Sequence, residues 1–409
     1  MTLGPLIWVA IPLLNETYNL PKLLSSLKKQ SYQNFKVIVC VNQPDCWWDI
    51  QDKRELCEDN QKSIQLLQDE KELSISIIDK SSQGNGWTGK EGGVPWARKL
   101  LFDTIMESAS ILDFVISLDG DTDFSEKYFE SILENFSNHK NAVALSIPYY
   151  HKLMGNVQSD LAILRYEIYM RYYHINMIRI KSVYQFAALG SAIAFPAWSY
   201  KKIKGIKPKP SGEDFYLLQK FRKFGPILNY NVEKVFPSSR PSDRVLFGTG
   251  PAVINGMKGE WERYPIYSMK LYDDIESACQ MFNEYKIIST PNKVTDFFHE
   301  KLKESDQWEK IKSSSSSEER FVRACHEKFD GLRILQYLKF SKDKLKNNDT
   351  DNLNQFFLRH YPDSKIISDK IELDVNNLES LNIIRDELFA IENHLLHEQW
   401  TNWNHKQKW

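Results

Sequence analysis

The sequence has few cysteines, and none of them are paired in a metal-binding or redox spacing. The odd count of five comprises Cys40, Cys46, Cys57, Cys279 and Cys325, and no two form a CxxC motif. Disulfide scaffolds and structural zinc sites usually show even counts or paired spacings. The sequence therefore predicts free thiols in a reducing compartment.

No apolar run is long enough to cross a membrane as a helix. The longest runs, 6–14 and 186–198, are shorter than the roughly 20 residues that a bilayer requires. The first run has no basic leader before it and has the character of a strand, so we expect no signal peptide. We expect a location in the cytoplasm or at the inner face of the membrane, with peripheral membrane contact left open.

An excess of one charge sign is also missing. The 409 residues include 53 Lys and Arg against 54 Asp and Glu, a formal net charge of −1, which argues against a nucleic-acid partner bound over the whole surface. With 17 Gly and 16 Pro the chain is neither collagen-like nor dominated by linkers. Apolar residues make up 42%, enough for a core, and the length predicts roughly two to three domains.

Apolar runs of strand length alternate with helical stripes through the first 125 residues. Strands are expected at 6–11, 35–41, 73–78 and 112–118, with helices at 17–30, 62–71 and 96–109. This alternation predicts an α/β fold, a doubly wound and mostly parallel sheet flanked by helices. Later strands are expected at 142–147 and 190–195, and later helices at 160–180, 215–224, 318–340 and 378–400. From about residue 261 the pattern is helical, which predicts a C-terminal helical extension.

Polar residues follow each of the first four expected strands. They include Asn15 and Glu16, Asn42 and Asp45, Asp79, and the run Asp119-Gly120-Asp121-Thr122-Asp123. In an open parallel sheet, ligands bind beyond the carboxyl ends of the strands. These polar groups are therefore expected to converge on one rim.

The run from Asp119 to Asp123 places three carboxylates at alternate positions. Such groups repel one another, and a divalent cation with a preference for oxygen ligands, Mg²⁺ or Mn²⁺, would relieve the repulsion. A solvated acidic turn is the alternative. A calcium loop of the EF-hand type is rejected, because Phe124 stands where that loop needs glycine and the preceding segment is a strand.

A glycine-rich loop follows the third expected strand. Gly84, Gly86 and Gly89 match GxGxxG, and Lys90 extends a partial phosphate-loop pattern in which Glu91 replaces the usual Ser or Thr. Two interpretations remain open. The loop is either a flexible surface segment or a segment that brings backbone N–H groups, Lys90 and Arg98 to an anion.

Four short motifs follow one another along the chain. They are the segment 11–16 (IPLLNE), the segment 92–99 (GGVPWARK), the segment 118–121 (LDGD) and the segment 212–215 (GEDF). Together they resemble the P-x-x-N-E, GGVxxAR, DxD and ED motifs of family 2 glycosyltransferases with the GT-A fold. The resemblance covers about residues 5–250, and the C-terminal 150 residues or so match no family that we can name.

The resemblance implies a domain organisation and a donor. A GT-A domain would span 1–258, with a nucleotide-sugar half at 1–125 and an acceptor half at 126–258, followed by a mainly helical region at 259–409. The donor would be a UDP- or GDP-linked sugar. The acceptor would be a glycan, a lipid-linked compound or a small molecule.

Roles at the donor site follow from the same resemblance. Pro12, Glu16 and Asn42 would line the base and ribose pocket, although Asn42 stands where the family usually has Asp. Arg98 would contact the nucleotide, and Lys90 is a further candidate for the diphosphate. The metal ligands would be Asp121, with Asp119 facing the ribose or a metal-bound water, and Asp123 as the remaining acid of the cluster.

The ED motif carries the expected catalytic group. Asp214 would be the general base that accepts the proton of the acceptor hydroxyl, and Glu213 would shape the same corner. A plain helix start is the alternative, because acids favour the first turn of a helix. An arginine-bearing loop follows at 239–244, in which Arg244 is expected to bind the diphosphate.

The leading hypothesis is a metal-dependent, inverting hexosyltransferase. A retaining GT-A transferase or a sugar nucleotidyltransferase would share the fold and the acidic rim. A non-catalytic module that binds a nucleotide or glycan is the third hypothesis.

Overall fold

The structure is a computed structural model and describes residues 4–209, 212–242, 248–287, 292–342 and 348–403. The chain divides into two compact units. Unit 1 consists of the described residues within Met1–Ser159, Ala187–Ile254 and Trp400–Lys406. Unit 2 consists of those within Asp160–Phe186 and Asn255–Gln399. The C-terminal helices therefore group with part of a helix from the middle of the chain.

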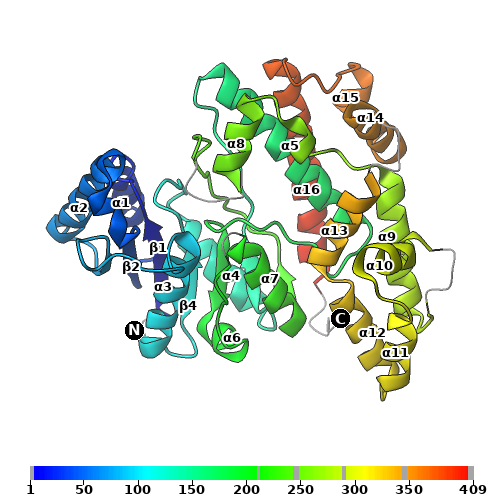
Figure 1. The fold of residues 1–409 in the computed structure, drawn as a ribbon, viewed down its shortest axis with the longest axis horizontal. Coiled ribbons are helices and arrows are strands. Elements are labelled where there is room, and N and C mark those ends of the chain that lie inside the picture. Colours follow the sequence, from blue (N-terminus) through cyan, green and yellow to red (C-terminus); the bar gives the residue numbers. More distant parts are fainter. Residues whose placement is uncertain (1–3, 210–211, 243–247, 288–291, 343–347, 404–409) are drawn as a thin grey trace. The chain divides into compact units, whose positions relative to one another are not determined.

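In the part of the chain that the structure describes, unit 1 contains one seven-stranded sheet (Figure 1). The strands are β1 (Ile7–Leu13), β2 (Phe35–Asn42), β3 (Ile75–Lys80), β4 (Phe114–Ser117), β5 (Ala144–Ser146), β6 (Ile193–Pro196) and β7 (Ile227–Leu228). Their order is β3-β2-β1-β4-β6-β5-β7. The strands β1 to β4 are mutually parallel, whereas β6 runs antiparallel to β4 and β5. The predicted α/β class with a mostly parallel sheet is confirmed.

The central strand β1 is buried along its whole length, as expected of a continuous apolar strand covered on both faces. The strand expected at 6–11 extends further than predicted, because pairing with β2 continues through Pro12 to Leu13. The carbonyl of Ala10 accepts the N–H of Leu118, so the backbone polar groups of Ala10 face β4. Alternate residues of a strand direct these groups to the same side, so those of Pro12 face β4 as well. Since pairing with β4 stops at Ala10, the missing N–H of Pro12 removes no ladder bond.

Helices cover the sheet, and those predicted at 17–30, 62–71, 96–109 and 215–224 are present, the second beginning earlier, at Arg54. The helices of unit 1 are α1 (Leu20–Lys28), α2 (Arg54–Asp69), α3 (Val94–Ser108), α4 (Tyr128–Asn138), α6 (Ala197–Lys202) and α7 (Glu213–Phe224), with short 3-10 turns at Asp45–Asp49 and Gln51–Lys53. Of these, α4 and α6 were not predicted. Helix α3 packs against β1 and β2, and α2 packs against β2 and β3. Helix α7 packs against β5 and β7.

Unit 2 is helical, which confirms the expected C-terminal extension. Two further helices, α5 (Val157–Arg179) and α8 (Thr249–Met257), begin in unit 1 and end in unit 2. Helix α16 (Leu378–Thr401) begins in unit 2 and ends in unit 1. The others are α9 (Met269–Asn283), α10 (Lys293–Leu302), α11 (Gln307–Ser314), α12 (Glu318–Lys328), α13 (Gly331–Ser341), α14 (Asp349–His360) and α15 (Lys365–Ser368), with a 3-10 turn at Trp261–Arg263. Helix α9 contacts α10, α12, α13 and α14, so it forms the centre of this unit.

The single helix expected at 318–340 is two helices. Ser317 caps α12 by accepting the N–H of Arg320, and the side chain of Asp330 caps α13 by accepting the N–H of Arg333. Between them Phe329 leaves the helical conformation. An Asp side chain that bonds to a backbone N–H favours the start of a new helix over continuation of the preceding one. The apolar stripe in the sequence therefore runs across a point at which the helix is broken.

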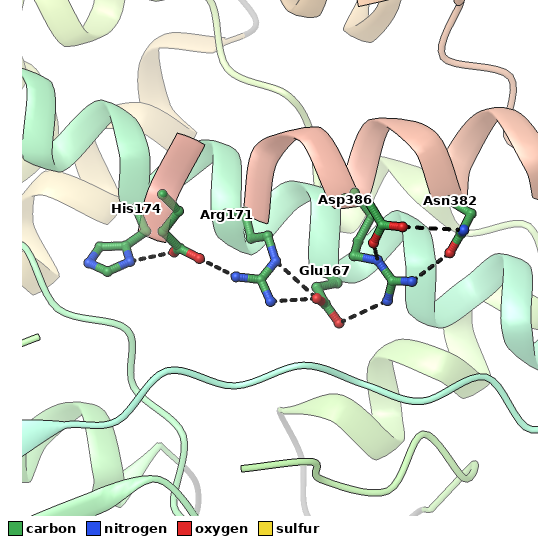
Figure 2. Close-up of polar contacts among 7 residues, drawn as sticks. Glu167, Arg171, His174, Asn382 and Asp386 are labelled. Carbon is green, nitrogen blue, oxygen red and sulfur yellow. Dashed lines mark hydrogen bonds and ion pairs between the residues drawn. The ribbon is translucent and has the colours of Figure 1, made fainter. Parts of the chain in front are cut away.

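A chain of buried ion pairs lies between α5 and α16 (Figure 2). Arg171 bonds to Glu167 at 2.6 Å and also to Glu392, and His174 Nδ1 lies 2.6 Å from the same Glu392. Arg385 adds a longer contact of 3.9 Å to Glu167.

Among the described residues, no helix is long and apolar enough to span a bilayer.

Candidate functional site

Arg98 is the centre of a buried polar cluster in unit 1. Its side chain is 2% exposed, and its three nitrogens each donate a hydrogen bond. Nε donates to Ser117 Oγ at 3.1 Å, Nη2 donates to Asp119 Oδ1 at 2.8 Å, and Nη1 donates to Glu213 Oε1. The guanidinium therefore joins the start of α3, the end of β4 and the start of α7.

Two glycines make this arrangement possible. Gly93, at the start of α3, has φ 75°, a left-handed conformation that a side chain would strain. Gly190 lies against the guanidinium, and a Cβ at that position would come within 2.5 Å of Arg98 Nη2. The GGVPWARK segment thus shapes the turn that brings Arg98 into the cluster.

Asp214 lies in the first turn of α7, beside this cluster. Burial and the neighbouring carboxylate of Glu213 raise the pKa of Asp214 to about 7, against the opposing effect of Arg98. Asp119 also contributes to the rise, so its charge acts on Asp214. The N–H of Phe215 donates to Asp214 Oδ1 at 2.7 Å and orients the carboxyl group. A carboxyl group that titrates near neutral pH suits proton transfer.

A second group of ion pairs includes Asp121, which belongs to the same acidic run as Asp119. Arg240 contacts Asp121 at 3.1 Å through Nε and binds Glu16 through Nη2. Glu16 is 2% exposed and also accepts a hydrogen bond from Asn19 at 2.8 Å. A Cβ on Gly120 would come within 2.9 Å of Glu16 Cγ, so the glycine between the two aspartates allows this close packing.

Arg240 was missed as a site residue by the sequence reasoning. That reasoning selected Arg244 from the same loop, and Arg244 lies outside the described residues. The available signal was that the segment 239–244 carries two arginines. Choosing between them requires the position of the loop relative to Glu16 and Asp121.

The third acid of the cluster has lysine partners. Asp123 Oδ2 lies 2.5 Å from Lys22 Nζ and 3.2 Å from Lys152 Nζ.

Within the described ranges, no group of three or more His, Cys, Asp or Glu side chains is arranged to hold a metal ion. Asp119 and Asp121 nonetheless fit Mg²⁺ or Mn²⁺, because such ions are commonly held by one or two carboxylates together with substrate phosphates.

The remaining predicted donor-site residues lie at the same end of the sheet. Pro12 is buried within β1, and Lys90 is exposed in the loop before α3. Asn42 is buried, and both ends of its amide are bonded: Nδ2 donates to the carbonyl of Leu13 at 2.9 Å, and Oδ1 accepts from Trp87 Nε1 at 3.2 Å. Asn42 thus ties the ends of β1 and β2 to the glycine-rich loop.

The glycine-rich loop does contact an anionic group, and that group belongs to the chain itself. The N–H groups of Gly84 and Gly86 point to Asp45 Oδ1 at 2.7 and 3.3 Å. Asp45 N–H in turn donates to the carbonyl of Trp87 at 2.9 Å. These two N–H groups therefore serve to anchor the loop after β3 to the turn after β2.

No protein-family model matches the chain, and no curated protein matches it. Solved structures that are similar to it include residues 1–349 of S. aureus TarS in complex with UDP-GlcNAc, at 12% identity, with 97% of this chain and 91% of that chain covered and a TM-score of 0.39. The mannosyltransferase PcManGT from Pyrobaculum calidifontis, in complex with GDP-Man and Mn²⁺, also has 12% identity, with 96% and 88% covered and a TM-score of 0.34.

A third similar structure is glucosyl-3-phosphoglycerate synthase from Mycobacterium tuberculosis, with Mn²⁺, UDP-Glc and phosphoglyceric acid. It has 12% identity, 63% of this chain and 80% of that chain are covered, and the TM-score is 0.36. At these low TM-scores the function must be argued from the chain's own residues.

Proposed function

We propose that the chain is a glycosyltransferase that moves a sugar from a UDP- or GDP-linked donor to a hydroxyl group of an acceptor. The observation that carries the proposal is the Arg98 cluster, which brings Asp119 and Glu213 onto one guanidinium. Through it the expected DxD and ED motifs meet, although they are about 95 residues apart in the sequence. A glycan, a lipid-linked compound or a small molecule is the acceptor in this proposal.

Asp214 is the general base of the proposed reaction. Its pKa of about 7 leaves a large fraction ionised at neutral pH and still basic enough to accept a proton. As the acceptor oxygen bonds to the anomeric carbon, its proton passes to Asp214, and the bond to the nucleoside diphosphate breaks with its electron pair on the departing oxygen. One displacement of this kind inverts the anomeric centre.

Glu213 and Arg98 act as positioning residues. Glu213 is 6% exposed and its carboxylate is engaged by Arg98, so it is not available to take a proton from an acceptor. The charge of Arg98 restrains the rise in the pKa of Asp214, and its fixed position holds Asp119 at the end of β4. Pro12, Glu16, Asn42 and Lys90 are proposed to surround the nucleotide.

Asp119 and Asp121 would hold Mn²⁺ or Mg²⁺. Such an ion supplies Lewis-acid stabilisation of the charge that develops on the diphosphate. Arg240, which contacts both Asp121 and Glu16, is placed to offer its planar guanidinium to the phosphate oxygens. Asp123, held by two lysines, supports the turn that carries the other two acids.

A thermal-shift experiment tests the donor site. UDP, GDP and CDP are added separately, each with and without Mn²⁺ and with Mg²⁺ in place of Mn²⁺. We expect one nucleotide to raise the melting temperature only when the metal is present. Asp121→Asn should lose that shift, whereas Asp69→Asn, on the exposed end of α2 in the same unit, should keep it. The proposal fails if no nucleoside diphosphate shifts the melting temperature under any condition.

Turnover of the donor tests the catalytic assignment. With the nucleotide identified, UDP- or GDP-sugars are incubated with the protein and release of the nucleoside diphosphate is measured. Asp214→Asn should abolish release in the presence of acceptor while nucleotide affinity stays close to that of the parent. Pyrophosphate as the product would identify a sugar nucleotidyltransferase, and retention of configuration would identify a retaining enzyme. Full turnover by the variant would refute Asp214 as the base.

A further inference from the structure

A run of exposed lysines begins in α6 and continues through the segment that leads to α7. Five of the nine residues from Lys201 to Lys209 are lysine, and all five are exposed. Residues 197–209 contain no acid, and Pro210 and Ser211, which lie outside the described residues, carry no charge. The positive charge of this run is therefore not cancelled within the segment itself.

The contacts of these lysines do not neutralise them. Lys201 Nζ donates to the carbonyl of Ala109 at 2.9 Å, and none of the five lysines pairs with an acid among the described residues. A sixth lysine, Lys220 on α7, donates to the carbonyl of Gly205 at 2.7 Å. Burial and then the charge of Lys207 lower the pKa of Lys220, so this cation lies close to the run.

The acids of the adjoining helix α3 and the turn after it offset only part of this charge. Asp103 pairs with Lys99 and accepts the hydroxyl of Tyr200 at 3.0 Å. Asp113 is buried and accepts a hydrogen bond within its own turn at 2.9 Å. Glu107 is exposed near the end of α3. Of these three acids, Glu107 alone is exposed and without a lysine partner, and it stands against six lysines.

Exposed apolar side chains lie beside the lysines. Ile111 and Leu112, in the turn before β4, are 62% and 71% exposed, and Phe224, at the end of α7, is 44% exposed. Helix α6 adjoins both places, through the hydrogen bond of Lys201 to the turn and through Trp198, whose ring lies 6.2 Å from that of Phe224. Single exposed apolar residues are common, but apolar groups that are surrounded by polar ones mark interaction sites.

Helix α6 and the turn before β4 lie at the end of the sheet opposite to the Arg98 cluster. The N–H of Ala197 donates to the carbonyl of Asp113 at 2.8 Å, so α6 begins where β4 begins. Asp119 follows the other end of β4. Figure 1 shows α6 at the lower end of unit 1. A partner bound here would leave the proposed transfer site open.

We propose that α6, the segment 203–209 and the turn 110–112 form a docking surface for a membrane that carries anionic lipids. The lysines contact the phosphate groups of the lipid heads, and Ile111 and Leu112 enter the boundary between head groups and acyl chains. Groups of four to eight basic residues are typical of proteins that bind anionic lipids. A nucleic acid would neutralise the lysines but would give the two aliphatic side chains no apolar contact.

Co-sedimentation of the full chain with lipid vesicles tests the proposal. The probes are vesicles of phosphatidylcholine alone and of phosphatidylcholine mixed with phosphatidylglycerol. We expect binding to the mixed vesicles only, and weaker binding as salt is added, because salt screens exposed charges. Lys202→Gln combined with Lys207→Gln should weaken this binding roughly tenfold or more, since each basic residue near an anionic surface contributes roughly fivefold.

Matched substitutions elsewhere in unit 1 control for general effects of charge and polarity. Lys62→Gln combined with Lys127→Gln removes two exposed lysines from α2 and from the start of α4, and should leave vesicle binding unchanged. Leu112→Asn should weaken vesicle binding severalfold, whereas Val232→Asn, at a side chain that is 67% exposed, should not. All of these side chains are exposed, so the melting temperature should stay close to that of the parent.

Amide hydrogen exchange locates the contact. Mixed vesicles should protect residues 109–112 and 198–209, and the nucleotide-dependent thermal shift should be the same in the docking variants as in the parent. Docking and the proposed transfer function can therefore fail separately. The docking proposal is overturned if mixed vesicles do not bind, if pure phosphatidylcholine binds equally well, or if the control variants lose as much binding as their counterparts. Binding of a DNA duplex through the same lysines, with vesicle binding unaffected by Leu112→Asn, would overturn it in favour of a nucleic-acid surface.

Discussion

Gly190 leaves the space that the guanidinium of Arg98 occupies, since an added Cβ would come within 2.5 Å of Nη2 and 2.8 Å of Cζ. The two residues come from different segments, since Gly190 lies in the turn before β6 and Arg98 lies near the start of α3. Because Arg98 holds both Asp119 and Glu213, anything that displaces it also separates the two acidic motifs. The geometry of the site therefore depends on a residue without a side chain.

Gly190→Ala should disturb the cluster through Arg98. Overpacking of a buried site typically costs about 1–3 kcal/mol of unfolding free energy, and we expect a loss of this size together with reduced donor turnover. Urea denaturation measures the stability. The control is a double-mutant cycle in the Arg98→Ala background, where the same methyl group should cost clearly less. An equal cost in both backgrounds would contradict a contact with Arg98.

Asp214 should make stability fall as the pH rises. Its folded-state pKa of about 7 exceeds the unfolded value near 4, so its contribution is fully present below about pH 4 and is lost as the pH rises towards 7. Asp214→Asn removes this loss and should gain stability relative to the parent between pH 5 and pH 8, measured by urea denaturation. Asp69→Asn should show no such trend. A pH-independent difference between Asp214→Asn and the parent would argue against the raised pKa.

Arg240→Gln should destabilise unit 1 and weaken nucleotide binding. It removes a cation from Glu16, which is 2% exposed. Because Arg240 is itself 28% exposed, the pair is only partly buried, and we expect a cost of about 1–3 kcal/mol. Adding Glu16→Gln should recover part of the stability, because the buried charge is then gone. Arg54→Gln, at an exposed pair 3.9 Å from Glu58, is the control and should change stability by less than about 1 kcal/mol. If the two arginine substitutions have equal effects, the Glu16 contact is unimportant.

Glu392 should stabilise unit 2 at neutral pH and lose that effect in acid. Burial by itself raises the pKa of Glu392, but Arg171 and His174 outweigh it, so the pKa lies below its ordinary value. A lowered folded pKa gives stability that is present above about pH 4.3 and is lost as the pH falls further. Glu392→Gln should therefore cost about 3–5 kcal/mol at pH 7 and less in acid.

Chemical denaturation at pH 7 and pH 4 measures that difference. Glu398→Gln is the matched control on the same helix, since Glu398 forms an exposed pair with His394 at 3.5 Å. The control should stay within about 1 kcal/mol of the parent at both pH values. A similar cost for both substitutions would show that the buried chain of ion pairs in Figure 2 adds nothing to stability.

Much of the fold was predictable because its signals are local. The buried strand β1 is a continuous apolar run, and helices such as α1 carry an apolar stripe within a few turns, so neither depends on distant residues. The break between α12 and α13 was missed because Asp330 can continue a helix or cap the next one, and the apolar stripe runs across it.

By itself the sequence determined the α/β alternation, the helical C-terminal region and the acidic groups at the ends of the strands. Only the tertiary structure decided how these groups pair. Arg98 meets Glu213 across 115 positions of sequence, and Arg240 meets Glu16 across 224. Contacts at such separations depend on where whole elements pack and on the space that residues such as Gly190 leave open, which no local pattern of residue types encodes.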